Sequence, residues 1–215
     1  MSTHHTVLMV SVGTGCVGMT ERVKENRIRL ISRDIVKKNT VFTVCSDHIE
    51  DDSHHEVRDY ISIIPNNLAS GSIAGVAVLP ITREGLYGFL DIFRHPLGKA
   101  SLEVVKGHVE ANEEEGSAAV RELYEETGCQ IQPESLTWLG STAPEPGVIQ
   151  ARTSLFWAKV GEGTGSPQGE LGHGKLMFFD KGKVLNLIND GAIEDASTLA
   201  LLLKYELTVN AFAMR

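Results

Sequence analysis

The chain has 215 residues, of which 42% are hydrophobic and 22% are charged, and both proportions are ordinary for a globular protein. Its formal net charge of −8 argues against a nonspecific nucleic-acid binder, because such proteins need a basic surface. The sequence contains no apolar run of membrane-spanning length and no Lys or Arg before the short apolar stretch at its start. We therefore expect neither a membrane span nor a secretory signal. The three widely spaced cysteines favour free thiols in a reducing cytoplasm.

Short β-strands dominate the first half of the sequence. They are predicted at residues 28–33, 40–46, 56–64, 72–80 and 86–94. Polar stretches separate the first three, and Gly85 supplies the glycine that a hairpin needs between the last two.

One helix follows these strands, at residues 113–127. Three acids occupy its first turn, Ala119 and Leu123 form an apolar pair one turn apart, and Gly128 stands where a C-terminal glycine belongs.

Further strands and a second helix complete the chain. The strands are predicted at about 136–142, 152–160 and 175–180, with a glycine-rich loop between the last two. Asp195 can cap the C-terminal helix. Its buried stripe is predicted to consist of Leu199, Leu202, Leu203 and Leu207. The order of elements indicates an α+β fold, because strands and helices do not alternate as they do in βαβ proteins.

A glycine-rich motif near the start of the chain offers one functional alternative. Gly13–Gly18 reads GxGxxG after an apolar run, and Asp34 follows about where the ribose-binding acid of a dinucleotide-binding protein would lie. Residues 19–26 leave barely two turns for a crossover helix, and no strand–helix alternation follows before residue 113. A glycine-rich turn near a chain end is the other interpretation.

The segment 107–129, GHVEANEEEGSAAVRELYEETGC, carries more chemistry. On a helix, Glu122, Glu125 and Glu126 share one face, where bound cations would relieve their mutual repulsion. Oxygen ligands without nearby His or Cys suit Mg²⁺, or Mn²⁺, better than zinc. Arg121 lies one turn before Glu125 and can hold that carboxylate. A solvated acidic helix face is the alternative interpretation.

The backbone before this helix also suits a metal. Gly107 allows a tight turn, so the carbonyl of Lys106 can face the same metal cluster.

The spacing of Gly107, Glu113, Arg121 and the following residues to Gly128 is G-x5-E-x7-R-E-L-x-E-E-x-G, and it resembles the Nudix box without a gap. Cys129 stands where a branched aliphatic residue is commoner. The resemblance implies an α/β/α sandwich with a mixed sheet, in which the box forms a loop–helix–loop. It also implies hydrolysis of a nucleoside diphosphate linked to another group, X.

The same resemblance assigns roles within the box. Glu122 and Glu126 would be the primary metal ligands, and Glu125 would share a metal or be held by Arg121. Two or three Mg²⁺ ions would neutralise charge at phosphorus and activate a water for in-line attack.

Segments outside the box resemble the subgroup that hydrolyses ADP-ribose and related NDP-sugars. Residues 93–96 resemble its Tyr-Arg-x-Pro segment, residues 102–107 its Leu-Glu-Leu-Pro-Ala-Gly lead, and residues 191–198 the opening of its last helix. The resemblance implies a substrate contact for Arg94 and a site role for Glu103. A surface arginine and an edge-strand acid are the alternatives. This chain departs from the subgroup's pattern at two positions. Val105 replaces the usual proline before the box, and Ala151 stands where many ADP-ribose hydrolases carry an acid.

Members of the subgroup supply a further glutamate from a loop between the late strands. In this chain the loop 161–174 contains Glu162 and Glu170. Glu170 is the predicted metal ligand or base, because flanking glycines allow the loop to fold over a diphosphate. Glu162 and a solvated loop acid are the alternatives.

The sequence does not identify the residue that stacks on the base. Tyr60, Phe93 and Trp138 are the candidates.

The expected function is Mg²⁺-dependent hydrolysis of ADP-ribose or an NDP-sugar to a nucleoside monophosphate and a sugar phosphate. The alternatives are a Rossmann-type dinucleotide-binding protein and a catalytically silent nucleotide-sugar sensor. We expect an N-terminal strand segment at 1–65 that forms a homodimer, followed by the hydrolase domain at 66–215. Neither nucleic acid nor a membrane is an expected partner.

Overall fold

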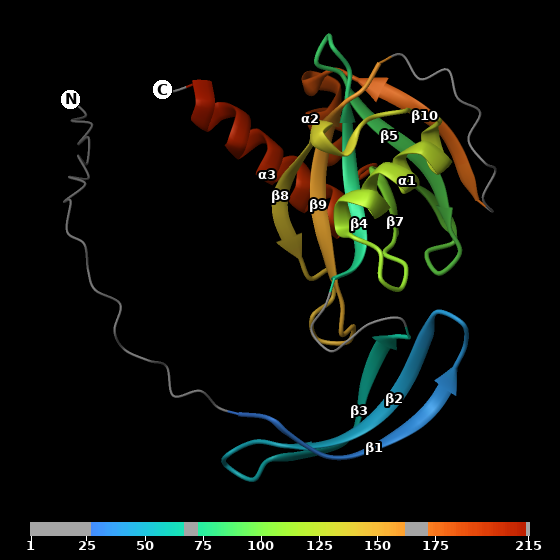
Figure 1. The fold of residues 1–215 in the computed structure, drawn as a ribbon. Helices are drawn as coiled ribbons and strands as arrows, with labels where there is room; N and C mark the ends of the chain where they lie inside the picture. Colours follow the sequence, from blue (N-terminus) through green and yellow to red (C-terminus); the bar gives the residue numbers. More distant parts are fainter. Residues whose placement is uncertain (1–26, 67–72, 162–171, 214–215) are drawn as a thin grey trace, which may run out of the picture.

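The computed structural model describes residues 27–66, 73–161 and 172–213, which fold into two β-sheets and three α-helices (Figure 1). The Gly13–Gly18 motif lies outside these residues. In the part of the chain that is described, no helix is both long and apolar enough to cross a membrane.

The N-terminal sheet has three antiparallel strands in the order β1-β2-β3. The strands are β1 (Arg29–Lys38), β2 (Phe42–Glu50) and β3 (Glu56–Pro65). All three were predicted, but the first two run further than expected. The polar pair Lys37 and Lys38 continues β1, since its ladder with β2 sustains it and no buried face is required of this exposed strand. Asp34 lies on β1 and pairs antiparallel with β2, so it does not occupy the parallel setting of a dinucleotide-binding fold.

The second sheet has seven strands. They are β4 (Ile73–Ile81), β5 (Tyr87–Arg94), β6 (Lys99–Glu103), β7 (Val105–His108), β8 (Leu136–Thr142), β9 (Arg152–Lys159) and β10 (His173–Phe179). The order is β10-β5-β4-β9-β8, and the parallel pairing of β4 with β9 makes the sheet mixed. β4 and β5 meet at Ile81 and Tyr87, after which β6 pairs with β5 and β7 pairs with β4. The sequence pattern missed β6 and β7, because they are short and have little apolar alternation.

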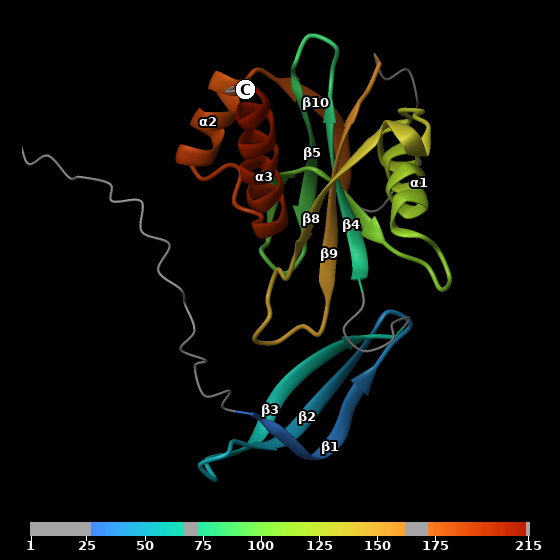
Figure 2. The ribbon, with the colours of Figure 1, turned by 60° about the vertical axis from the view of Figure 1, so that its left-hand side comes forward.

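Helices cover both faces of the larger sheet (Figure 2). α1 (Glu115–Thr127) packs on one face, where Leu123 joins a core with Val76 and Val78. α2 (Lys181–Asn189) and α3 (Ala196–Ala213) lie on the other, where Leu201 packs with Leu79. The α+β prediction and the expected α/β/α sandwich are confirmed.

The ends of α1 explain its actual length. It begins at Glu115 and not at Glu113, whose carboxylate instead accepts hydrogen bonds from Arg121 outside the helix. It ends as predicted, because Gly128 takes the left-handed conformation at φ 70° and donates its N–H to Tyr124 O.

Aspartates cap the other two helices. Asp180 accepts from the N–H of Lys183 at 2.8 Å and starts α2, a short helix that the sequence pattern did not predict. Asp195 accepts from the N–H of Thr198 at 2.8 Å, which confirms the predicted cap of α3.

The predicted buried stripe of α3 is wrong in its second half. Leu202 is buried, but Leu203 and Leu207 are 61% and 62% exposed, and Leu201 takes their place in the core. Tyr205 of α3 still packs on Tyr87 and Trp157 of the sheet, with ring centroids 5.6 and 5.3 Å apart. Leu203 and Leu207 lie one turn apart on the face of the helix that turns away from this contact.

The two sheets touch along β3 and the loop that joins β8 to β9. Ile63 donates its N–H to Val148 O at 2.8 Å and accepts at its own carbonyl from the N–H of Gln150 at 2.9 Å. The hydroxyl of Tyr60 donates to the carbonyl of Gly147. These bonds bring the start of β2 to the edge of the larger sheet.

Candidate active site

Gly107 and Glu122 are packed against each other. A Cβ atom built on Gly107 would lie 1.8 Å from Cδ of Glu122, so no residue with a side chain fits there without displacing that carboxylate. Glu122 is buried, although it is ionisable, and Arg121 donates to its Oε1 from Nη1 at 2.8 Å. The glycine is therefore required by the close approach of a helix carboxylate to strand β7.

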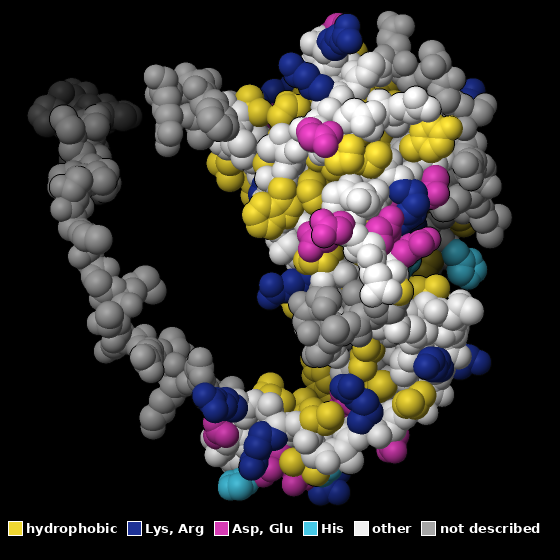
Figure 3. All heavy atoms as spheres, in the orientation of Figure 1, with side chains coloured by type: hydrophobic (Ala, Val, Ile, Leu, Met, Phe, Trp, Pro, Cys, Tyr) yellow, Lys and Arg dark blue, Asp and Glu magenta, His cyan; other side chains and the backbone are white. Residues whose placement is uncertain are grey.

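Glu126 lies one helical turn after Glu122 and is also buried. The backbone N–H of Lys106 donates to its Oε2 at 3.3 Å. Glu125 is partly exposed and accepts at Oε2 from Arg121 at 3.1 Å, which is the pair expected from the sequence. Acidic side chains gather on the side of the molecule where α1 lies (Figure 3).

Arg121 ties the helix to the loop before it. Its Nε and Nη2 donate to the two carboxylate oxygens of Glu113, each at 2.9 Å, and Nη2 also donates to His108 O at 2.9 Å. The hydrogen bonds to Glu113 are the main reason that the pKa of Arg121 is raised, and those from Arg121 lower the pKa of Glu113. Glu113 also accepts from the N–H of Glu110 at 2.9 Å, which closes the loop.

The fit of this acidic site to a metal ion is partial. Among the described residues, no group of three or more His, Cys, Asp or Glu side chains is arranged to hold a metal. Glu122 and Glu126 are both buried next to strand β7, whereas Glu125 is drawn to Arg121. These oxygen donors match the ligands that Mg²⁺ and Mn²⁺ prefer.

A chain of ion pairs lies across β7 from these carboxylates. Arg94 donates to both oxygens of the buried Glu103, at 2.9 and 2.7 Å. The ammonium of Lys106 lies 2.5 Å from Glu103 Oε2 and 2.7 Å from Asp195 Oδ1. Burial alone would raise the pKa of Glu103, but the hydrogen bonds from Arg94 and the charge of Lys106 outweigh it and lower the pKa to about 2. Arg94 and Glu103, two predicted substrate-binding residues, are thus directly paired.

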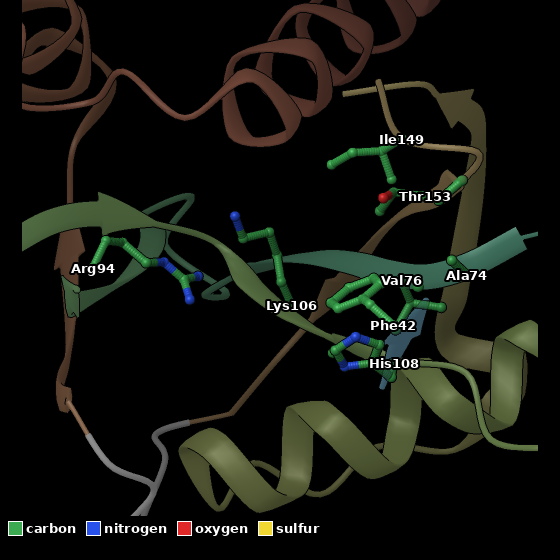
Figure 4. Close-up of a pocket in the computed structure, with 11 residues that line it drawn as sticks. Phe42, Ala74, Val76, Arg94, Lys106, His108, Ile149 and Thr153 are labelled. Atoms are coloured by element: carbon green, nitrogen blue, oxygen red, sulfur yellow. The ribbon is translucent and has the colours of Figure 1, made fainter. Parts of the chain in front are cut away.

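A cavity of about 240 Å³ opens beside this network (Figure 4). Its polar wall includes Arg94 and Lys106, and Ile149 and Thr153 lie opposite. Phe42, from the N-terminal sheet, completes it and meets the ring of His108 edge-on, with ring centroids 6.1 Å apart. A second cavity, of about 470 Å³, is also lined by Arg94. Its other lining residues are Pro96, Leu97, Ser101, Glu103, Glu194 and Asp195.

None of the three predicted stacking residues lines the first cavity. Tyr60 donates its hydroxyl to Gly147 O, and Phe93 and Trp138 are exposed. Sequence reasoning missed Phe42 because no motif surrounds it and it lies 65 residues before Gly107, although it opens the second strand. The sequence pattern assigned a role to the carbonyl of Lys106 but did not predict that its side chain lines this cavity.

The predicted loop acids cannot be placed. Glu162 and Glu170 lie outside the described residues, between β9 and β10.

Comparisons with known proteins agree with this geometry. The family model described as NUDIX domain matches residues 72–199. The chain is 38% identical over 84 residues to the methanol dehydrogenase activator of Bacillus methanolicus, and 36% identical over 84 residues to the ADP-ribose pyrophosphatase of Bacillus subtilis (strain 168). Each match covers 39% of this chain and 44% of the relative, so less than half of either relative is spanned.

The fold is similar to that in the crystal structure of an ADP compounds hydrolase. The TM-score is 0.70 at 16% sequence identity, and the match covers 86% of this chain and 95% of that one. At this identity the likeness concerns the fold alone.

Proposed function

The chain belongs to the Nudix family, and on that premise we propose that it is a metal-dependent hydrolase of nucleoside diphosphates linked to a second group, with ADP-ribose or an NDP-sugar as substrate. Cleavage of the diphosphate would give a nucleoside monophosphate and a sugar phosphate. The similarity to an ADP-ribose pyrophosphatase supports this choice of substrate class.

One observation carries the proposal. The carboxylate of Glu122 rests on Gly107, and the buried Glu126 accepts from the backbone of Lys106, so two acids of the helix converge on a strand without an intervening side chain. A chain that only needed a stable helix would place apolar side chains there, because buried carboxylates are costly without cations.

The family uses divalent metal ions, and the donors in this chain suit Mg²⁺ or Mn²⁺. Glu122 and Glu126 would hold the metal, together with the carbonyl of Lys106 and with Glu125. Bound there, it would supply positive charge at phosphorus and lower the pKa of a water. Arg121 and Glu113 orient Glu122 through the hydrogen bonds described above. Glu170, with Glu162 as its alternative, is proposed to complete the site.

The two cavities suggest how a two-part ligand would lie. Arg94 lines both of them, so a diphosphate next to its guanidinium would have one substituent in each. The cavity lined by Phe42 suits an aromatic base. The carboxylates and Ser101 of the second cavity can accept hydrogen bonds from sugar hydroxyls.

The N-terminal sheet is proposed to form a homodimer interface, and residues 1–65 and 66–215 to be the two functional parts of the chain. Several aliphatic side chains of this sheet are exposed. They are Leu30, Ile31, Ile35, Val36, Val57 and Ile61, and the exposed Ile28 directly precedes β1. Apolar surface on an exposed sheet is typical of a protein–protein contact. The buried free thiols of Cys45 and Cys129 support a reducing compartment, and we propose a cytoplasmic location.

The test is a Mg²⁺-dependent screen of ADP-ribose, ADP-glucose, GDP-mannose, dinucleoside polyphosphates and NADH, with products identified by mass spectrometry. We expect one phosphorus-containing product to carry a single ¹⁸O when the reaction runs in ¹⁸O water. Release of inorganic phosphate from the diphosphate substrate would contradict the proposal. Tight binding of ADP-ribose without turnover would favour the silent sensor.

A further inference from the structure

The side chain of Lys106 occupies an unusual place for a lysine. It projects from β7 between Arg94 and Phe42 in the view of Figure 4, and it lines the cavity next to both. Its side chain is only 19% exposed, and its ammonium is clamped by Glu103 and Asp195. A lysine held in this way is fixed in position, which an exposed lysine is not.

Both acids of the clamp are themselves held. Arg94 binds both oxygens of Glu103, and Asp195 Oδ2 accepts from the N–H and the hydroxyl of the buried Thr198, at 2.8 and 2.7 Å. Oδ1 of Asp195 is therefore left for the ammonium. The clamp joins β7 to the start of α3 through these bonds.

An ammonium has three N–H donors. Within the described residues its acceptors are Glu103 and Asp195, which leaves one donor for a group in the cavity that Lys106 lines. Lys106 also directly precedes Gly107, on which Glu122 rests, so the charge is one residue from the acidic site.

We propose that the ammonium of Lys106 is a second cationic contact for the diphosphate of the substrate, beside Arg94, and that Glu103 and Asp195 orient it. This inference rests on the proposed function. It goes beyond the resemblance, because the subgroup's lead segment has alanine at the position of Lys106. The two positive charges of Arg94 and Lys106 equal the two negative charges of Glu103 and Asp195, so the network has zero net charge. The negative charge of a bound diphosphate would therefore have to be neutralised by a metal ion.

A purely structural lysine would behave differently. It would tie β7 to α3, and its removal would lower stability without a selective effect on anion binding. The two roles separate when affinity, its salt dependence and the melting temperature are measured on the same variants.

The experiment titrates the whole protein with the methylene analogue of ADP-ribose, in which CH₂ replaces the bridging oxygen, by calorimetry in the presence of Mg²⁺. Lys106→Met should weaken binding about tenfold or more, because a charge-assisted hydrogen bond is lost. The dissociation constant of this variant should also rise less steeply with KCl concentration than that of the wild type, since one charged contact is lost. Lys106→Arg should restore most of the affinity.

Lys181→Met is the matched control. Lys181 also pairs with a carboxylate, that of Glu206, and neither residue lines either cavity. It should bind the analogue as the wild type does. If Lys106→Met does not fold, Asp195→Asn provides the second route, because it loosens the clamp while its amide oxygen can still cap α3, and it should weaken binding severalfold.

The outcomes are separable. Wild-type affinity and salt dependence in Lys106→Met, or in Asp195→Asn where the first variant does not fold, would overturn this inference and leave the proposed function standing. A wild-type protein that neither binds the analogue nor cleaves any substrate of the screen would overturn both.

Discussion

The 107–129 segment and the N-terminal sheet differ in which side chains they bury and which they expose to solvent. In the segment, polar groups bond to one another, as the half-buried Glu113 and Arg121 do with each other and as Arg121 does with the buried Glu122. In the sheet, aliphatic side chains such as Ile35 and Val36 are exposed. The first region thus brings together polar groups that can bind a charged ligand, whereas the second presents apolar surface that a partner or a ligand would cover. We infer that chemistry belongs to the first and that assembly and base recognition belong to the second.

The largest expected effect tests whether the chemistry lies within the segment. Glu122→Gln and Glu126→Gln each should lower kcat by about 10²-fold or more, because a charged metal ligand is lost while size is kept. Circular dichroism should show intact folding.

Glu114→Gln is the control for this pair. Glu114 precedes the same helix, is exposed and makes no side-chain cap hydrogen bond, so turnover should be unchanged. Near-normal turnover in both Glu122→Gln and Glu126→Gln would contradict their role as metal ligands.

The second prediction asks whether a loop outside the segment contributes. Glu170→Gln should lower kcat by about tenfold or more with little change in KM at saturating Mg²⁺, since the group would act in the transition state. Glu162→Gln should be mild. The reverse ranking would transfer the role to Glu162, and two mild variants would leave the chemistry to the helix acids.

The third prediction concerns the ion pairs of Glu103 with Arg94 and Lys106, which lie between the 107–129 segment and the first cavity. The pKa of Glu103 is about 2 in the folded protein against an ordinary 4.5, so its ionisation stabilises the fold above pH 4.5, and that contribution disappears as the pH falls toward 2. The shift corresponds to up to about 3 kcal/mol. The free energy of unfolding in urea should therefore fall less between pH 6 and pH 3 in Glu103→Gln than in the wild type. Parallel pH profiles would contradict this.

The fourth prediction tests whether the N-terminal sheet reaches the ligand. Phe42→Ala should raise KM about tenfold with kcat little changed, because the lost ring contacts the base equally in ground and transition states. Phe93→Ala is the matched control, since Phe93 is exposed and does not line the cavity. If only Phe93→Ala raises KM, the stacking role returns to Phe93.

The smallest effect on catalysis is expected from a variant designed to disrupt the proposed homodimer interface. The wild type should be a dimer by light scattering at micromolar concentration, and Ile35→Asp with Val36→Asp should make it a monomer, because charges would enter a buried apolar contact. A wild-type monomer would contradict the proposed homodimer.

The sequence by itself determined the helical part of the 107–129 segment and its end at Gly128. The common face of Glu122, Glu125 and Glu126 depends on spacing along one helix that ends at Gly128, and such short-range geometry is the same in any fold that contains the helix. The cap at Asp195 and the succession of most strands were predictable for the same reason.

Only the tertiary structure decided which distant residues meet. Phe42 reaches the cavity because β3 bonds to the loop around Val148, and the ammonium of Lys106 finds Asp195 because α3 begins next to β7. Leu203 and Leu207 look like core residues in the sequence, yet they lie on the face of α3 that turns away from the sheet, opposite Tyr205. Periodicity describes which side chains share a face, but whether another layer covers that face depends on the lengths and packing of elements far away in the chain.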